Sequence, residues 1–531
     1  MKIKFYIFLT FMALVEWLPA QESEMIFTIG KPENGKFNKK DIIAADEKNI
    51  AVLNVTGLES LDLYDKNTLE FVKNVPIFKT EGDGGKYEAE FYESLRIKLV
   101  ENIQGKLFIF TQKTIKENKI KQQVVYCTVL DEKYQVIHYL KEVMSADYVS
   151  AIYTPSYGSI GIEFDEESGQ ILLIHQPLTE PKQSLYINTK VLDFELNILS
   201  QGIIELPFKA AQKAGNKYLI PVKHSFRNNL IYSYLHIEAG YENQSDLFGP
   251  DEYIAVIGIS DPATKNTRVI PLDLSNKKLF EIMAYFVGDQ LKIISLYQNT
   301  DPKKKNKEVW YHGFFSAQIN EKTYTVENEI FSEFTPRQIS DLANANNLIK
   351  QRAKEEDIKN ERVNGYLSIQ EIILADNALL LVGEYKHDYI NESGSSITVK
   401  YDNSKRGSIC LFKFSPDGQL ENINSYERTD HYSQLSDHRG HENVFTKSVL
   451  YVFKSKKEQT FNIFFSNTLL RVDIPTLEIQ SHAIDFEFSV PYRYTLYKEN
   501  AFVDENVCYF YRSHLAGIQA VQYYIIGKIE N

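Results

Sequence analysis

The sequence has few of the residues that cross-link small secreted proteins, and it lacks the common catalytic signatures. Its 531 residues include 3 cysteines, 2 tryptophans and 5 methionines. Cys127, Cys410 and Cys508 are an odd number, stand in alternating apolar stretches and match no metal-site spacing, so we expect buried free thiols. No GxSxG, HExxH, Walker A or GxGxxG motif is present. Stability must come from a large core, which a chain of this length with 43% hydrophobic residues can supply.

Concentrated positive charge is also missing. The formal net charge is −12, and Lys303-Lys304-Lys305 is a lone basic cluster in a polar stretch. Nucleic-acid-binding domains carry a basic groove or patch, so we expect no nucleic-acid partner.

Long apolar runs are confined to the N-terminus. Lys2 and Lys4 precede the apolar stretch Phe5–Val15, and small Ala20 stands before the polar Gln21. This order is typical of a secretory signal peptide, and the run is about half of the ~20 residues that a membrane span needs. The sequence therefore predicts a signal peptide over residues 1–20. We expect export to the periplasm, cell surface or medium, with no transmembrane segment after cleavage; a retained anchor is the alternative.

A strand pattern repeats along the chain after residue 20, and the full sequence is rich in Tyr (34) and Phe (32). A short apolar strand meets a tight acidic or Asn/Gly turn, and a very apolar second strand follows. After a longer polar loop come a third strand, another tight turn and a fourth strand. The predicted second strands are Ile50–Val55, Leu107–Gln112, Ile171–His175, Leu230–His236, Gln290–Leu296, Ala378–Glu384, Val449–Lys454 and Val507–Arg512.

Such units cannot each bury both faces of their sheet, but packing them around an axis can. We therefore predict an all-β fold: one domain over 21–531, a β-propeller of seven or eight four-stranded blades. The lone strand Glu24–Gly30 is expected to pair into the last blade and close the ring. Another all-β fold, such as a pair of β-sandwiches, is the alternative.

One segment breaks the pattern. Residues 336–359 lack β alternation, are rich in Ala, Leu, Lys and Glu, and place Ile339, Leu342 and Ala343 at helical spacing. They predict a short helical insertion between the fifth and sixth units.

Loop lengths suggest where a site lies. In a four-stranded blade, the first-second and third-fourth turns share one face, and these turns are tight. The opposite face takes almost every long polar stretch, including Lys79–Ser94, Thr114–Gln122, His387–Arg406 and Glu427–Asn443. Long loops on a rigid ring commonly carry binding residues, although tolerated insertions are the alternative. The candidate ligand- or partner-binding residues are Tyr385, His387, Asp388, Tyr389, Asp430, His431, Asp437, His438, Arg439 and His441.

Three of these histidines invite a metal interpretation. His431, His438 and His441 lie among carboxylates, and both ligand types suit zinc. Their spacing is not that of HExxH or a Cys/His finger, and exposed loop histidines are the simpler interpretation. The sequence therefore predicts no metal and no cofactor.

The sixth unit resembles a known group. The segments Leu367-Ser-Ile-Gln-Glu-Ile-Ile-Leu374, Leu379-Leu-Leu-Val-Gly-Glu-Tyr385 and Arg406-Gly-Ser-Ile-Cys-Leu-Phe-Lys-Phe-Ser-Pro-Asp-Gly418 are similar to a group of uncharacterised exported Bacteroidota proteins. In that group a "GGAVLVGE-Y" strand precedes a "DI-V-F-PDG-IEW" hairpin. The resemblance covers about 366–466 with the preceding helix. It departs at Asp376-Asn377-Ala378, where the group has glycines, and at Glu421-Asn422. The resemblance implies export and no particular activity.

Two functions stay open. Loop asymmetry without catalytic motifs favours an exported cell-envelope binding or scaffold protein, whose partner is an envelope protein or a glycan. The alternative is a secreted polysaccharide hydrolase or lyase with carboxylate acid/base residues. The 71 acidic residues offer too many pairs for the sequence to select one.

Overall fold

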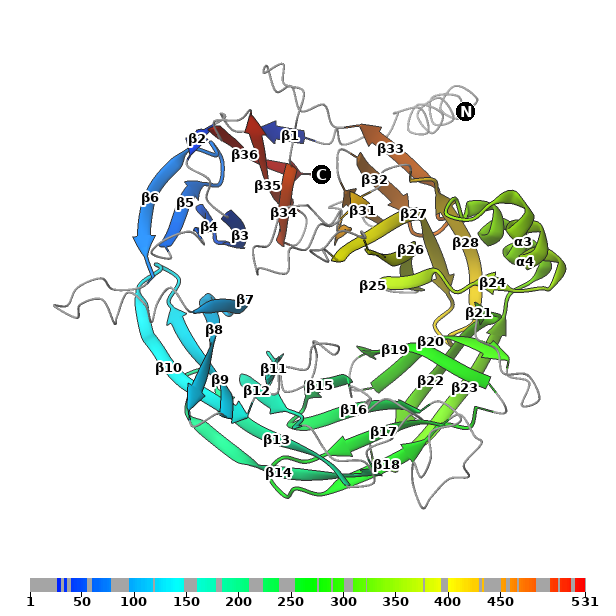
Figure 1. Cartoon of the computed structure of the whole chain (residues 1–531), viewed down its shortest axis with the longest axis horizontal. Helices are drawn as coiled ribbons and strands as arrows, with labels where there is room; N and C mark the ends of the chain where they lie inside the picture. The colour runs from blue at the N-terminus through cyan, green and yellow to red at the C-terminus, as the bar shows by residue number, and fades with distance from the viewer. Residues whose placement is uncertain are drawn as a thin grey trace, which may run out of the picture.

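The chain forms a ring of antiparallel sheets in the computed structural model (Figure 1). The structure describes residues 26–29, 33–35, 40–54, 60–77, 95–117, 120–147, 160–177, 184–209, 223–237, 254–274, 277–287, 290–299, 309–320, 322–375, 378–392, 400–428, 432–433, 450–454, 459–465, 468–483, 497–504, 507–516 and 521–530.

In the described part of the chain, eight sheets surround the central axis, each with a path of four strands. The first four blades are β3 (Lys40–Ala45), β4 (Asn49–Asn54), β5 (Ser60–Asp65), β6 (Phe71–Pro76); β7 (Arg96–Ile103), β8 (Lys106–Glu117), β9 (Ile120–Leu130), β10 (Val136–Asp147); β11 (Ile160–Asp165), β12 (Gln170–His175), β13 (Ser184–Asp193), β14 (Ile198–Lys209); and β15 (Lys223–Arg227), β16 (Leu230–Ile237), β17 (Ile254–Ser260), β18 (Thr267–Pro271).

The last four complete the ring. They are β19 (Lys277–Val287), β20 (Gln290–Asn299), β22 (Gly313–Asn320), β23 (Thr325–Glu333); β25 (Leu367–Ala375), β26 (Ala378–Glu392), β27 (Lys400–Phe414), β28 (Leu420–Tyr426); β30 (Tyr451–Lys454), β31 (Thr460–Phe465), β32 (Thr468–Asp473), β33 (Ile479–Ala483); and β34 (Tyr497–Asp504), β35 (Val507–Ala516), β36 (Val521–Glu530), β1 (Ile26–Ile29). The predicted β-propeller is confirmed, and this topology gives eight blades.

The N-terminal strand closes the ring. β1 pairs antiparallel with β36, from Ile26 opposite Glu530 to Ile29 opposite Gly527. The short β2 (Glu33–Gly35) pairs with the same strand. The innermost β34 contacts both β30 and β3, its neighbours on either side. The predicted closure by the strand at 24–30 is therefore confirmed.

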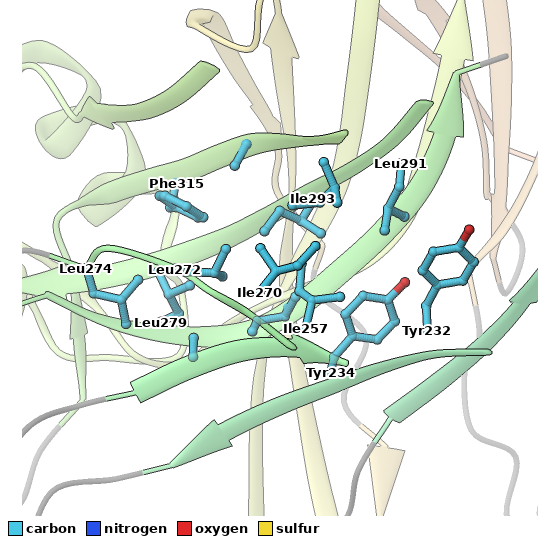
Figure 2. Close-up of a cluster of buried hydrophobic side chains, with 14 of the residues drawn as sticks. Tyr232, Tyr234, Ile257, Ile270, Leu272, Leu274, Leu279, Leu291, Ile293 and Phe315 are labelled. Atoms are coloured by element: carbon cyan, nitrogen blue, oxygen red, sulfur yellow. The ribbon is translucent and has the colours of Figure 1, made fainter. Parts of the chain in front are cut away.

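The core lies between the blades. Ile231 and Tyr232 are adjacent on β16 and both are fully buried. Ile231 packs toward blade 3 and Tyr232 toward blade 5, because successive strand residues point to opposite faces. Figure 2 shows the blade 4–blade 5 cluster, to which Tyr232, Leu291 and Phe315 all belong. A strand whose sheet is covered on both faces needs apolar side chains at successive positions. This explains why the second strands are almost continuously apolar.

One face of the ring is made of short turns. Asp65 begins the turn between β5 and β6, where its carboxylate accepts the backbone N–H groups of Asn67 and Thr68. Leu69 ends that turn with φ of 57°. Asp193 and Leu196 (φ 59°) repeat the arrangement in blade 3. We call this side the short-turn face and the opposite side the long-loop face.

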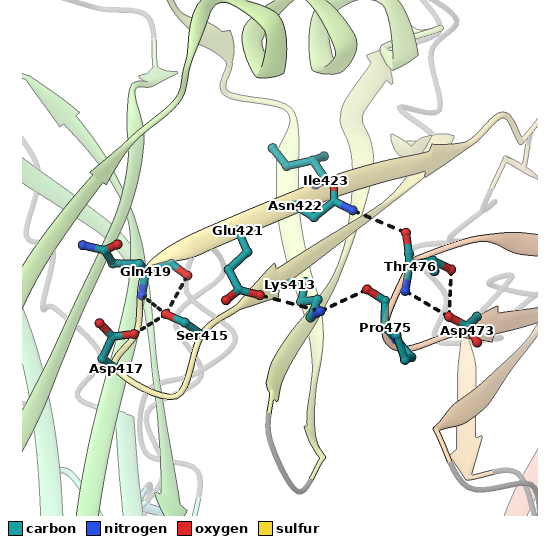
Figure 3. A network of polar contacts seen from close by, with 10 residues as sticks. All are labelled: Lys413, Ser415, Asp417, Gln419, Glu421, Asn422, Ile423, Asp473, Pro475 and Thr476. Atoms are coloured by element: carbon teal, nitrogen blue, oxygen red, sulfur yellow. Dashed lines mark hydrogen bonds and ion pairs between the residues drawn. The ribbon is translucent and has the colours of Figure 1, made fainter.

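Neighbouring blades are hydrogen-bonded to one another on the short-turn face (Figure 3). Lys413 of blade 6 donates to the carbonyl of Pro475 in the blade 7 turn at 3.0 Å, and Asn422 donates to that of Thr476 at 3.3 Å. Lys292 of blade 5 donates to the carbonyl of Pro416 in the blade 6 turn at 3.1 Å. These contacts connect neighbouring blades through the carbonyl groups of their turns.

The helical insertion is confirmed as two helices. α3 (Pro336–Ala345) begins with a capping box in which Thr335 and Gln338 bond reciprocally, and α4 (Gln351–Lys359) follows after a short break. Both lie outside the ring beside blade 6 (Figure 1). β21 (Trp310–Tyr311) and β24 (Val363–Asn364) pair with each other and tie the insertion to blade 5.

One strand prediction and one loop prediction were wrong. Val449–Lys454 was taken as a second strand, but Tyr451–Lys454 is the innermost β30 and the second strand is Thr460–Phe465. The second strand was missed because Asn462, which is fully buried, interrupts its apolar run. The stretch Thr114–Gln122 is not a long loop, because β8 continues to Glu117 and β9 starts at Ile120.

The three cysteines are buried free thiols, as expected. No helix in the part of the chain that the structure describes is long and apolar enough to cross a membrane.

Candidate functional site

Blade 6 differs from its neighbours on the long-loop face. The stretch His387–Arg406, expected to be a loop, is mostly strand: β26 and β27 stay paired from Leu379 opposite Phe414 out to Glu392 opposite Lys400. Polar composition suggested a loop, but ladder hydrogen bonds join backbone groups and need no apolar side chain. The result is a long hairpin, and β29 (Tyr432–Ser433) pairs with its β27 side.

The predicted site residues divide into three groups. His387, Asp388 and Tyr389 lie on β26 in this hairpin. Tyr385, also on β26, is fully buried, and its hydroxyl donates to the carbonyl of Leu342 at 2.8 Å. Burial raises the pKa of Tyr385, and its ring belongs to the core rather than to a ligand surface. The remaining residues lie outside the described part of the chain: Asp430, His431, Asp437, His438, Arg439 and His441.

The metal interpretation therefore stays a prediction. Across the described ranges, no group of three or more His, Cys, Asp or Glu side chains is placed to hold a metal ion. The three histidines that motivated the idea are not among those residues.

A buried ion cluster lies at the base of the hairpin. Glu384 accepts from Arg406 at one carboxylate oxygen (2.8 Å) and from Arg428 at the other. The Glu384 and Arg428 side chains are 2% and 0% exposed. The Arg428 guanidinium also lies 4.8 Å from the ring centroid of Phe465 in blade 7. A carboxylate engaged on both oxygens by two guanidinium groups fixes strands β26 and β27 and the end of β28 relative to one another.

The helical insertion is hydrogen-bonded to the base of the same hairpin. Asn347, between α3 and α4, donates to the carbonyl of Arg428 at 2.6 Å and accepts the N–H of Ser408 at 3.2 Å. The Ser408 hydroxyl donates to the carbonyl of Ala345. Gly407 makes this approach feasible, since a Cβ there would lie 2.6 Å from the Asn347 amide oxygen. We call Glu384, Arg406, Arg428, Asn347 and Gly407 the blade 6 platform.

Sequence reasoning missed this platform. The alternation of side chains along β26 could have predicted it. Leu380 and Val382 lie on one face of β26 and pack in the cluster between blade 6 and blade 7. Glu384 continues their face and therefore enters the same interface. A carboxylate placed there needs buried cationic partners.

A second group of titratable residues is set on the innermost strands of blades 2 and 3. Burial, together with the charge of Glu101 on β7, raises the pKa of Glu163 on β11 to about 7. Burial and the charge of Glu166 also raise the pKa of Glu101. A carboxyl group that keeps its proton near neutral pH can act as a proton donor, as glycoside-cleaving enzymes require.

No protein-family model matches the chain, and no curated protein matches it. Solved structures match over most of its length at low identity. The polysaccharide lyase Uly1 is 7% identical with a TM-score of 0.39, over 81% of this chain and 89% of that one. The WD40 domain of SCAP from fission yeast is 7% identical with a TM-score of 0.37, over 95% and 98%.

Dipeptidyl peptidase 4 from Porphyromonas gingivalis is 9% identical with a TM-score of 0.39, and the match spans 92% of this chain but 59% of that protein. Similarity at this level carries no information about activity. The function has to follow from the residues of this chain.

Proposed function

We propose that this protein is an exported cell-envelope binding or scaffold protein that holds an envelope protein or a glycan on its long-loop face. The observation that carries the proposal is the blade 6 platform. A buried carboxylate with two arginine partners and a docked pair of helices hold a hairpin longer than the other described hairpins of the ring. Rigid support of an extended element lowers the entropy lost when a partner binds.

The opposite face supports the same assignment. Its turns are short and are hydrogen-bonded from blade to blade, as at Lys413 and Pro475. Recognition residues concentrate on long connections displayed by a rigid scaffold. The long-loop face therefore suits a partner better than the short-turn face does.

Hairpin exchange tests this function. An Asn-Gly turn replacing residues 387–405 joins Lys386 to Arg406, which are already a cross-strand pair, and leaves the ion cluster in place. The matched control replaces residues 115–122 of blade 2 in the same way, joining the paired Thr114 and Gln123. Each protein is used as bait for envelope extract and for a glycan array, with the melting temperature as a folding check.

We expect the blade 6 exchange to abolish capture of the partner and the blade 2 exchange to preserve it. Equal capture by both exchanged proteins and the parent would refute a role for the blade 6 hairpin.

A second candidate rests on Glu163. Because its pKa is raised to about 7, it supports a polysaccharide hydrolase or lyase with this residue as proton donor. A panel of polysaccharides, assayed for new reducing ends and for unsaturated products, tests it. Turnover that Glu163→Gln abolishes would support the candidate, and absence of turnover on the whole panel would remove it.

A further inference from the structure

The innermost strands carry most of their positive charge at one end. Each described blade has an innermost strand that runs from the long-loop face to the short-turn face. Among the first two residues of these strands, six are basic and one, Asp41, is acidic. The six basic residues are Lys40, Arg96, Lys223, Lys277, Lys278 and Lys498.

The other end of the same strands has no such excess. Their last two residues include two acidic residues, Asp165 and Asp504, and two basic ones, Arg227 and Lys454. Arg227 is also paired with Glu167 at 2.8 Å. The whole chain has a formal net charge of −12, so composition alone predicts an excess of negative charge. On the described innermost strands, positive charge is therefore concentrated at the long-loop end.

The six basic residues are far apart in the sequence and come together only in the ring. They belong to blades 1, 2, 4, 5 and 8, and the innermost strands of these blades surround the axis (Figure 1). Like charges gathered at one end of an axis produce a stronger local potential than a single lysine does. We call these six residues the basic mouth.

A further cation stands beside the basic mouth in blade 2. The register of β7 shifts between Ile97 and Leu99, so Lys98 is the extra residue of a β-bulge. Burial lowers the pKa of Lys98. An ammonium group that is partly withdrawn from water is stabilised by a nearby anion. Lys98 therefore favours a negatively charged ligand over a neutral one.

Aromatic rings position two cations of the basic mouth. The Nζ of Lys277 lies 4.5 Å from the ring centroid of Phe331, and the Nζ of Lys278 lies 4.7 Å from that of Phe280. Such cation–π contacts restrict where an ammonium group lies and leave its charge in place. Both lysines are thus held at the long-loop end of β19 and remain able to attract an anion.

We propose that the basic mouth and Lys98 bind an acidic polysaccharide through its carboxylate or sulfate groups. This ligand class rests on the proposed function and narrows the choice between an envelope protein and a glycan to a glycan with repeated negative charge.

The distribution of the cations favours a polymer over a small anion. Packed sheets lie about 10 Å apart, so a small anion reaches the cations of two neighbouring blades at most. An acidic polysaccharide carries a charge on each repeat and can contact several of the five blades with one chain. The export predicted from the N-terminus favours a glycan over a nucleic acid, which also repeats negative charge.

Paired lysine substitutions test the site. Lys98→Gln/Lys278→Gln removes cations from blades 2 and 5 at the long-loop end. The matched control is Lys133→Gln/Lys322→Gln, because both of these lysines are exposed in turns of blades 2 and 5 on the short-turn face. The two double variants change the net charge equally, and melting temperatures check their folding.

Titration calorimetry measures the binding of polygalacturonate, alginate and chondroitin sulfate to each protein. The carboxyl-reduced, neutral forms of polygalacturonate and alginate are the uncharged probes. We expect the parent to bind at least one acidic polysaccharide, less tightly as the salt concentration rises, and to bind neither neutral form. Lys98→Gln/Lys278→Gln should weaken binding by about tenfold, and the control pair should bind as the parent does.

A second pair tests whether other blades contribute. Lys223→Gln/Lys498→Gln changes blades 4 and 8 and should weaken binding to a similar extent. This pair also decides the outcome if the first double variant does not fold.

No binding on the whole panel, equal binding of the neutral forms, or equal weakening by the control pair would overturn the proposal. A thymidine oligonucleotide that binds as tightly as the best polysaccharide would also overturn it, because the site would then attract polyanions in general. Hairpin-dependent capture of an envelope protein would persist in each of these cases, so failure of the acidic ligand is distinguishable from failure of the proposed function.

Discussion

Glu163→Gln should make the protein more stable at alkaline pH and leave it unchanged in acid. The folded-state pKa of Glu163 is about 7 against an ordinary value of 4.5, owing to burial and the charge of Glu101. Between these values the unfolded chain releases a proton that the folded protein keeps. The stabilising contribution of protonated Glu163 is therefore complete below about pH 4.5 and is lost as the pH rises to about 7.

The magnitude follows from the size of the pKa difference. A change from 4.5 to about 7 corresponds to about 3 kcal/mol of folding free energy at pH 8. Glutamine is uncharged throughout this pH range, so the folding free energy of Glu163→Gln does not decrease as the pH rises. With an unfolding entropy of about 2 cal/mol/K per residue, about 3 kcal/mol shifts the melting temperature of a chain this long by about 3 °C.

Scanning calorimetry at pH 5 and pH 8 measures the effect. We expect the difference in melting temperature between Glu163→Gln and the parent to grow by about 2 °C from the lower to the higher pH, because about 1 kcal/mol of the effect is already present at pH 5. Glu101→Gln is the control, since removing its charge should lower the pKa of Glu163 and move the transition to lower pH. A difference that is the same at both pH values would refute the reasoning.

Three further predictions concern the blade 6 platform and ring closure. Glu384→Gln leaves two buried arginines without their carboxylate, and urea unfolding should show a loss of about 3–5 kcal/mol; a loss below about 1 kcal/mol would contradict the buried ion cluster. Gly407→Ala places a Cβ 2.6 Å from the Asn347 amide oxygen and should lower the free energy of unfolding by about 1–3 kcal/mol. The control Gly258→Ala should be tolerated, because the nearest atom to its Cβ is 3.6 Å away. Equal effects of the two substitutions would contradict the close approach at Gly407. Deleting 26–29 exposes the edge of β36 and should lower the melting temperature and promote aggregation; an unchanged melting curve would show that β1 does not hold the ring closed.

Much of the ring could be predicted from the sequence, because its repeating signal is physical. Second strands are covered on both faces, so they are apolar in both registers, as Ile231 and Tyr232 show. Tight turns require residues that accept backbone N–H groups, as Asp65 does. These two constraints recur in most units and locate most of the blades without any knowledge of contacts between them; blade 7, where Asn462 interrupts the second strand, and blade 8, whose fourth strand is β1, are the exceptions.

What escaped prediction depends on contacts between distant segments. Glu384, Arg406 and Arg428 look like ordinary surface charges until strands β26, β27 and β28 bring them together. Asn462 looks like a strand terminator, although it is buried within β31. The hairpin beyond Lys386 is polar and was predicted to be a loop. Amino-acid composition indicates whether a segment is buried, but not whether its backbone is paired with another strand.

Blade 8 has a consequence for how the protein is made. Its outermost strand is synthesised before every other strand of the ring, and its three remaining strands are synthesised after the other blades, because Ile26 pairs with Glu530. Early in synthesis β1 has no partner, and blade 1 lacks the neighbour that contacts β3. Contacts this distant along the chain form slowly, and until β36 is in place the chain keeps an open ring with two sheet faces uncovered. The ring can therefore close only after β36 has been synthesised, and the open ring is the stage at which a chaperone that binds exposed sheet faces matters most.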